Sequence, residues 1–176
     1  VKQGASSSLS TFPFQTGNSG NASGQFNYTL TSQAPVGWTA GFTVNSTSYT
    51  SSATVTIPAN TNYATTIDIT PNATVGVGKY TLSMTSVANP QAPAMTMTVY
   101  VISGVTDLIV NNTSGLGTGT GTPSQFEAQY TAGLVFAGNT ANAITDINVL
   151  IRAIQDGAMG NVKNVYMNMA WSFPTL

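Results

Sequence analysis

The sequence contains no cysteine and no histidine among its 176 residues. Without cysteine no disulfide can form, so a hydrophobic core of adequate size must stabilise the fold. The same two absences leave no thiolate or imidazole ligand, which excludes structural zinc and most catalytic zinc sites. The sequence shows neither an apolar run long enough to span a bilayer nor a signal-peptide pattern, and its first residue is Val1. We therefore expect a processed chain or an excerpt of a longer one.

Charged residues are also scarce. Four Lys or Arg and five Asp or Glu make up 5% of the chain, against about 25% in an average soluble protein. The net charge of −1 provides no field that would attract nucleic acid or anionic lipid, so we expect neither partner. Disorder is excluded because 41% of the residues are hydrophobic. Ser, Thr, Asn and Gln must solvate the surface, which suits a secreted or cell-surface protein or an assembled polymer.

Apolar residues alternate with threonine in the middle of the chain. Ala53, Val55 and Ile57 occupy one face of a stretch whose other face carries Thr54 and Thr56. This period of two predicts strands that are buried on one side only. Threonine suits the wet side because its branched carbon favours extended backbone while its hydroxyl stays solvated. Three later stretches repeat the pattern, with inward residues Tyr63, Thr65, Ile67 and Ile69, then Tyr80, Leu82 and Met84, then Met95, Met97, Val99 and Val101.

Three further strands are predicted nearer the N-terminus. Their inward residues are Leu9, Phe12 and Phe14, then Phe26, Tyr28 and Leu30 within Gln25–Thr31, then Trp38, Ala40, Phe42 and Val44. Seven short strands with a turn about every ten residues predict an antiparallel Ig-like β-sandwich over residues 1–103. The protein should therefore be mainly β.

Two stretches of this unit, NSGNASGQFNYTLTSQAPVGW and TVTIPANTNYATTIDITPNATVGVGKYTLSMTSV, resemble the NPCBM-associated Ig-like modules of secreted bacterial and archaeal proteins. The shared features are the Pro-x-Gly-Trp step, the Pro-Ala turn and the closing hairpin, which is two residues longer here between Pro71 and Tyr80. The resemblance implies an accessory module of a larger surface or secreted protein, without catalytic residues. Tyr80 occupies the position of a tyrosine corner, and an ordinary core tyrosine is the alternative.

The pattern changes after Ser103–Gly104, and residues 104–176 predict a small, incomplete α/β segment. A dense apolar run at 105–110 predicts a covered strand, and 163–171 predicts another. Between them we expect a helix that Ser124 and Glu127 cap, and a second helix that begins at Thr145 and ends at Gly157 or Gly160. The apolar stripes of the two helices would be Phe126, Tyr130, Leu134 and Ala137, and Ile147, Leu150, Ile151 and Ile154.

This second segment resembles the beginning of a class I glutamine-amidotransferase-like, flavodoxin-like domain of secreted Bacteroidota-type multidomain proteins. The resemblance rests on TDLIVNNTSG and VKNVYMNMAWSFPTL, and any nucleophile elbow of that family would lie beyond Leu176. No catalytic residue can be carried over. The last predicted strand has no helix after it, so another part of the protein or another chain should cover Val165, Met167 and Met169.

A glycine-rich loop spans residues 111–123, between the predicted strand and helix. Loops at that position often bind phosphate. Here the glycines alternate at 115, 117, 119 and 121, no Gly-Lys-Ser/Thr follows, and no acidic residue lies about twenty positions on. The pattern favours a surface loop over a nucleotide site, and we expect no cofactor.

Other candidate chemistry is sparse. The carboxylates Asp68, Asp107, Glu127, Asp146 and Asp156 are scattered, so strand faces and helix ends explain them better than a hydrolytic pair. The aromatic residues Trp38, Phe42, Tyr49 and Tyr63 could form a sugar-stacking platform, although core packing is favoured for the first two.

We therefore expect no metal and no catalytic residue, and a non-catalytic structural or adhesive module of a cell-surface or secreted protein. Its partners would be neighbouring domains or other copies in an extracellular assembly. A carbohydrate-binding module and a fragment of a secreted hydrolase are the alternatives.

Overall fold

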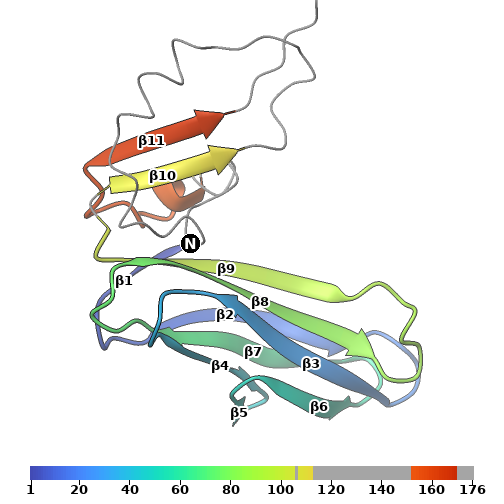
Figure 1. The fold of residues 1–176 in the computed structure, drawn as a ribbon. Coiled ribbons are helices and arrows are strands. Elements are labelled where there is room, and N and C mark those ends of the chain that lie inside the picture. The colour runs from blue at the N-terminus through green and yellow to red at the C-terminus, as the bar shows by residue number, and fades with distance from the viewer. Residues whose placement is uncertain (106, 113–151, 170–176) are drawn as a thin grey trace, which may run out of the picture.

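A computed structural model describes residues 1–105, 107–112 and 152–169. Residues 1–105 form two sheets that stack as two layers (Figure 1). Across the five-stranded sheet the order is β1 (Lys2–Gly4), β9 (Met95–Ser103), β8 (Gly76–Ser86), β3 (Gly24–Gln33) and β6 (Ser52–Ile57). Across the four-stranded sheet it is β2 (Ser10–Asn18), β7 (Thr61–Thr70), β4 (Thr39–Val44) and β5 (Thr47–Tyr49).

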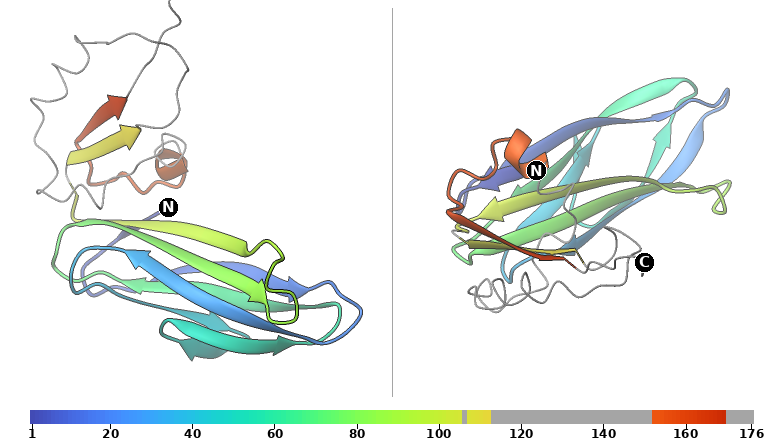
Figure 2. Two further views of the ribbon diagram at one scale, coloured as in Figure 1. Left: turned by 45° about the vertical axis from the view of Figure 1, so that its right-hand side comes forward. Right: turned by 90° about the horizontal axis from the view of Figure 1, so that it is seen from above.

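The predicted fold class is confirmed, because the protein is mainly β and the two sheets form a sandwich (Figure 2). Every pairing inside the sandwich is antiparallel except that of β1 with β9, which is parallel from Lys2↔Val101 to Gly4↔Ser103. The chain crosses between the layers after β3, because β4 pairs with β7 while β6 returns to pair with β3. A continuous core lies between the layers as a result.

Aromatic rings join the two layers at the centre of this core. The ring of Tyr28 on β3 stacks 6.0 Å from that of Phe42 on β4, and Phe42 stacks 5.3 Å from Tyr49 on β5. Such pairs add about 0.5–1.5 kcal/mol each beyond the area they bury. The buried members of the cluster are Phe12, Tyr28, Phe42, Val44, Ile57, Ile67, Ile69, Tyr80, Leu82, Met84, Val99 and Val101.

All seven predicted strands are present, and β1 and β5 are additional. The hairpin from β4 to β5 turns through Asn45 and Ser46, both at positive φ (46° and 67°), as a two-residue type I′ loop requires. The turn contains no glycine, so the sequence does not signal it. The strand β1 is polar and pairs with β9 at the edge of the sheet over only three residues, so no apolar alternation predicts it.

One inward position was predicted wrongly near a strand end. Leu9 precedes β2 and is 66% exposed, whereas Ser10 begins the strand and is buried. Trp38 precedes β4 and is half-buried against the core, with its indole Nε1 donating to the carbonyl oxygen of Thr74 at 2.9 Å. It keeps the inward period of Phe42 and Val44, as predicted.

Trp38 packs against the backbone of β8. A Cβ at Gly78 would lie 2.8 Å from the Trp38 ring and 2.7 Å from the Tyr80 ring, so glycine permits this close approach. The Tyr80 hydroxyl is buried and has no hydrogen-bond partner among the residues that the structure describes. A tyrosine corner would bond this hydroxyl to nearby backbone, so Tyr80 is instead a core tyrosine.

After the sandwich, β10 (Asp107–Asn112) and β11 (Asn164–Met169) pair in parallel, as the two strands predicted in this segment. The glycine loop beyond residue 112, the first predicted helix, its stripe and Trp171 lie outside the described residues. The same holds for Ile147, Leu150 and Ile151 of the second helix, and for the burial predicted for Val165, Met167 and Met169.

The end of the second predicted helix is described as a helical turn over residues 152–155. It closes in a Schellman motif, in which the Ala158 N–H bonds to the carbonyl oxygen of Ala153 and the Gly157 N–H to that of Ile154. Gly157 has φ +70°, so it ends the helix as predicted. The predicted inward position of Ile154 is wrong, since this side chain is 60% exposed and Ala153 is buried instead.

A second apolar cluster joins this turn to the sandwich. Its buried members are Val77, Tyr100, Ile102, Val105, Ala153 and Ala158, which come from both sides of the predicted boundary at Ser103–Gly104. The division into units 1–103 and 104–176 stays a prediction. Among the described residues no helix is long and apolar enough to cross a membrane.

Candidate functional site

A groove runs along the side of the sandwich where the edge of β9 faces the edge of β2. Among the described residues, Met95–Val99 pair with β8 alone, and β1 joins β9 from Val101 onward. β2 pairs with β7 alone in the described part of the chain. The sandwich is therefore open along this seam.

The part of the groove near the start of β9 is apolar and has a volume of about 220 Å³. Met95 and Met97 lie on the inward-facing side of β9, yet they are 57% and 37% exposed. Methionine side chains are flexible and adapt to differently shaped partners. The groove is lined by Phe14 and Thr16 of β2, Tyr28 of β3, Leu82 and Met84 of β8, and Met95 and Met97 of β9.

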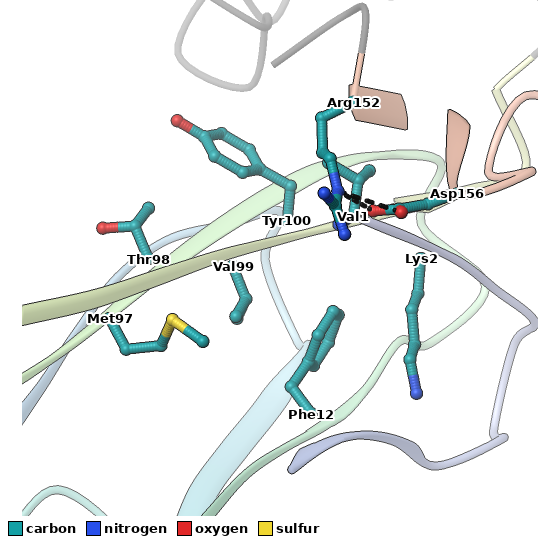
Figure 3. A pocket seen from close by; sticks show the side chains of 9 residues that line it. All are labelled: Val1, Lys2, Phe12, Met97, Thr98, Val99, Tyr100, Arg152 and Asp156. Carbon is teal, nitrogen blue, oxygen red and sulfur yellow. Dashed lines mark hydrogen bonds and ion pairs between the residues drawn. The ribbon is translucent and has the colours of Figure 1, made fainter. Parts of the chain in front are cut away.

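Met97 also lines a larger hollow of about 640 Å³ farther along the seam. Phe12 forms one wall, Val99 and Tyr100 form another, and charged groups stand at the far end (Figure 3). The two hollows therefore make one seam that is apolar over β9 and charged where β1 begins.

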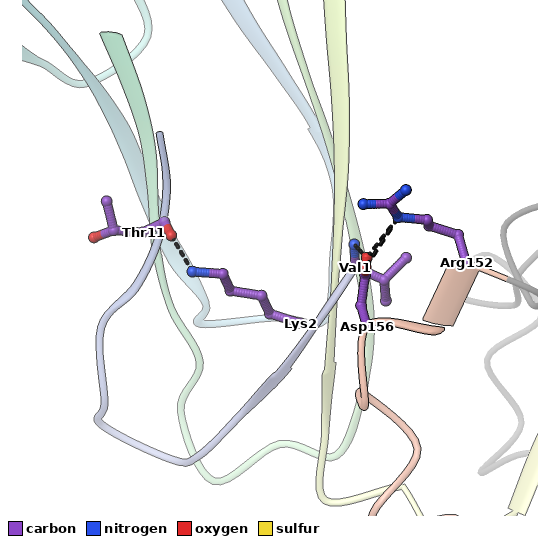
Figure 4. Close-up of polar contacts among 5 residues, drawn as sticks. All are labelled: Val1, Lys2, Thr11, Arg152 and Asp156. Carbon is purple, nitrogen blue, oxygen red and sulfur yellow. Dashed lines mark hydrogen bonds and ion pairs between the residues drawn. The ribbon is translucent and has the colours of Figure 1, made fainter. Parts of the chain in front are cut away.

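The charged end is an ion-pair cluster around Asp156 (Figure 4). The ammonium group of Val1 donates to Asp156 Oδ2 at 2.9 Å, and Arg152 Nε lies 3.0 Å from the same carboxylate. These hydrogen bonds, first from the terminal ammonium and then from Arg152, lower the pKa of Asp156 below its ordinary value. The cluster ties the beginning of β1 to the helical turn.

Lys2 lies beside this cluster and points the other way. Its Nζ donates to the carbonyl oxygen of Thr11 (Figure 4). The same atom stands 5.1 Å from the centre of the Phe12 ring. An ammonium over an aromatic face is an attractive contact of about 0.5–1 kcal/mol at an exposed site. Lys2 thus closes one end of the seam against β2.

The described carboxylates do not form a catalytic pair. Asp68 lies on the outer side of β7, where its Oδ2 accepts hydrogen bonds from Thr43 at 3.2 Å and Thr66 at 2.7 Å. It shares no partner with Asp156. The Asp107 side chain, Glu127 and Asp146 lie outside the described residues, and within those residues no cluster of three metal-ligating side chains occurs.

The predicted sugar platform is not an exposed row. Phe42 is 1% exposed, so the core interpretation is confirmed for it. Trp38, Tyr49 and Tyr63 are half-buried and pack against the core cluster. Stacking on a sugar needs an open ring face.

Two buried tyrosines on the neighbouring strands β3 and β8 differ in their hydrogen bonding. The Tyr28 hydroxyl donates to Thr16 Oγ1 at 2.7 Å, and this atom lies 2.8 Å from Thr65 Oγ1, so a short chain of hydroxyls connects the layers. Burial raises the pKa of Tyr28, partly offset by the bond to Thr16. Burial alone raises the pKa of Tyr80 to about 12.

The open seam is the feature that sequence reasoning missed. Alternation predicts Met95 and Met97 in the core, and they do face inward, but they are 57% and 37% exposed. The composition of the strand gave no signal of an edge, because MTMTV contains no charge and no proline. Edge strands usually carry such residues to prevent pairing.

No known family model matches the chain, and no curated protein matches it. Among solved structures, a family 123 glycoside hydrolase from Clostridium perfringens, described in work on glycolipid glycan hydrolysis, aligns with 93% of this chain at 12% identity and a TM-score of 0.40. The chain spans about a third of that structure, since 32% of its length is covered. At this identity and TM-score the likeness supports no conclusion about activity.

Proposed function

We propose that the chain is a non-catalytic structural or adhesive module of a cell-surface or secreted protein assembly. The observation that carries this proposal is the chemistry of the outer strand faces, which are hydroxyl- and amide-rich and almost free of charge. Such a surface stays hydrated while offering little electrostatic attraction to nucleic acid or charged lipid.

The outer faces are ordered by hydrogen bonds between neighbouring strands. Thr81 Oγ1 of β8 lies 2.9 Å from Thr98 Oγ1 of β9, and Thr54 Oγ1 of β6 donates to Asn27 Oδ1 of β3 at 2.7 Å. Cross-strand pairs of this kind contribute about 0.2–1 kcal/mol each. Their strength does not depend on ions in the surrounding medium, which suits a protein that works outside the cell.

Surface immunodetection tests the proposed location. Antibody against the purified chain should label intact cells of the source organism, or detect the chain in the medium, without permeabilisation. An antibody against a cytosolic protein is the control for cell lysis. Signal only after permeabilisation would overturn the proposal.

A glycan array tests the alternative in which the module binds carbohydrate. The half-buried state of Trp38, Tyr49 and Tyr63 favours no binding to any arrayed glycan. Binding that Tyr49→Ala abolishes, with the thermal midpoint retained, would replace the structural proposal by a carbohydrate-binding one.

A further inference from the structure

We infer that the outer face of β8 and β9, at the end where β9 finishes, is a docking surface for the segment that follows the sandwich. Through this surface the two parts of the chain fold and unfold as one cooperative unit. The inference stands whether or not the chain is extracellular. It concerns the predicted boundary at Ser103–Gly104, where an independent module would be joined to its neighbour by an exposed, flexible linker.

The outer face of β8 and β9 changes its chemistry along the strands. Near the start of β9 it carries hydroxyls, because Thr98 pairs with Thr81 of β8 there. Near the end of β9 it becomes apolar, because Ile102 pairs directly with Val77 of β8. Val77 is 1% and Ile102 is 2% exposed, although both point away from the core between the sheets. Another element therefore covers this end of the face.

The covering element is the helical turn at residues 152–155 together with the residues that follow it (Figure 1). Ala153 is 0% and Ala158 is 1% exposed, and both belong to the same apolar cluster as Val77 and Ile102. The Schellman motif brings the two alanines together, because the Ala158 N–H bonds to the carbonyl oxygen of Ala153 at 2.9 Å. Their small side chains let the turn approach the sheet closely.

The connection between the two parts also packs on the sandwich. β9 ends at Ser103 and β10 begins at Asp107, so few residues lie between them. Of these, Val105 is 1% exposed and belongs to the second apolar cluster. Gly104 has φ +66°, and a Cβ there would lie 2.9 Å from the Val75 side chain. The described residues of the connection therefore differ from a flexible linker.

Separation of the two parts would expose the second apolar cluster to water. Apolar burial would be lost on the sandwich at Val77 and Ile102, and on the segment at Ala153 and Ala158. Each part is therefore less stable when the other unfolds, which couples their unfolding. All six buried members are uncharged and are numbered between 77 and 158. Docking thus desolvates no charge and does not depend on where the sequence begins.

Hydrogen exchange of the full chain tests the coupling with a substitution far from the second apolar cluster. Ile57→Ala removes a side chain from the core between the sheets, which shares no buried member with that cluster. It should speed exchange of the Ala158 amide and of the β3 amides by the same factor, at least roughly 10-fold, because all of them open when the whole unit unfolds. Thr56→Ala, on the exposed face of the same strand, is the matched control and should leave both rates unchanged. Faster β3 exchange with an unchanged Ala158 rate in Ile57→Ala would overturn the inference.

The reciprocal test places a charge in the covering turn. Ala153→Glu should disrupt the second apolar cluster and speed exchange of the β3 amides at least roughly 10-fold, because a buried unpaired charge is strongly destabilising. Ile154→Glu adds the same charge at the neighbouring position, which is 60% exposed, and should leave the β3 rates unchanged. An Ala153→Glu chain that fails to fold while Ile154→Glu folds would support the coupling. Equal effects of the two variants, or unchanged β3 rates in Ala153→Glu, would contradict it.

Discussion

The two buried tyrosines Tyr28 and Tyr80 have nearly the same exposure but opposite surroundings. Tyr28 is 0% exposed and donates its hydroxyl proton to Thr16, whereas Tyr80 is 1% exposed and its hydroxyl has no partner in the described part of the chain. Both rings fill the core, so both stabilise the fold through apolar burial. Only the first hydroxyl regains in the protein the hydrogen bond that it loses in water.

The difference shows that polar atoms in this core act in two ways. At Tyr28, the hydroxyl bond to Thr16 connects β3 with β2 of the other layer, and Thr65 of β7 extends this chain within that layer, so the bonds help to fix how the layers align. At Tyr80, the ring lies close to Trp38 and to the backbone of Gly78. Its buried hydroxyl lowers the stability of the fold. Substitutions can separate these contributions.

The largest effect should follow from removing the ring that stacks on Tyr28. Phe42→Ala should lower the free energy of unfolding by about 3–5 kcal/mol, because it leaves a cavity between Tyr28 and Tyr49. Urea denaturation measures the change. Trp38→Ala, at the Tyr80 end, is the comparison and should cost less, since Trp38 is only partly buried. A larger loss of unfolding free energy for Trp38→Ala than for Phe42→Ala would contradict this prediction.

The second largest effect on stability should be a loss of unfolding free energy at high pH. Because folding raises the pKa of Tyr80 from 10.0 to about 12, the unfolded chain ionises first, and the free energy of unfolding falls as pH rises from 10 to 12. Two pKa units correspond to about 2–3 kcal/mol. Denaturation from pH 9 to pH 12 should therefore show a steeper loss for the natural chain than for Tyr80→Phe. Parallel curves would contradict the burial of this hydroxyl.

The smallest effect should distinguish the hydroxyls at neutral pH. Tyr28→Phe should cost about 1 kcal/mol, because Thr16 loses a donor in the core. Tyr80→Phe should be neutral or stabilising by up to about 1 kcal/mol, since it removes a buried hydroxyl without a partner. Thermal melts of both variants measure the two changes in stability. A loss of equal size in the two would show that Tyr80 has a partner in solution.

Much of the sandwich could be predicted from sequence because alternation with threonine is a local signal. Seven strands and most inward residues follow from it, since neighbouring side chains on a strand point to opposite faces. β5 could not be predicted, because Asn45 and Ser46 adopt positive φ without glycine. β1 could not be predicted either, because its place is set by a parallel pairing with residues about a hundred positions away.

The candidate site depends on relations between distant strands and was therefore less predictable. Alternation identifies the inward side of Met95 and Met97, but their exposure depends on which strands pair with β9. Similarly, Tyr28 and Tyr80 both occupy inward positions, and the partner of Tyr28 comes from another sheet. A period of two contains no information about either relation.

The parallel pairing of β1 with β9 also has a mechanical consequence. Tension that pulls the chain out at Val1 and at Ser103 acts along the two strands in opposite directions, so the ladder between Lys2↔Val101 and Gly4↔Ser103 is loaded in shear. All of its hydrogen bonds then bear the load together, instead of opening one after another as in a peeled hairpin. Because forced unfolding is governed by the rate of unfolding, this three-residue ladder between β1 and β9 would set the mechanical strength of the module.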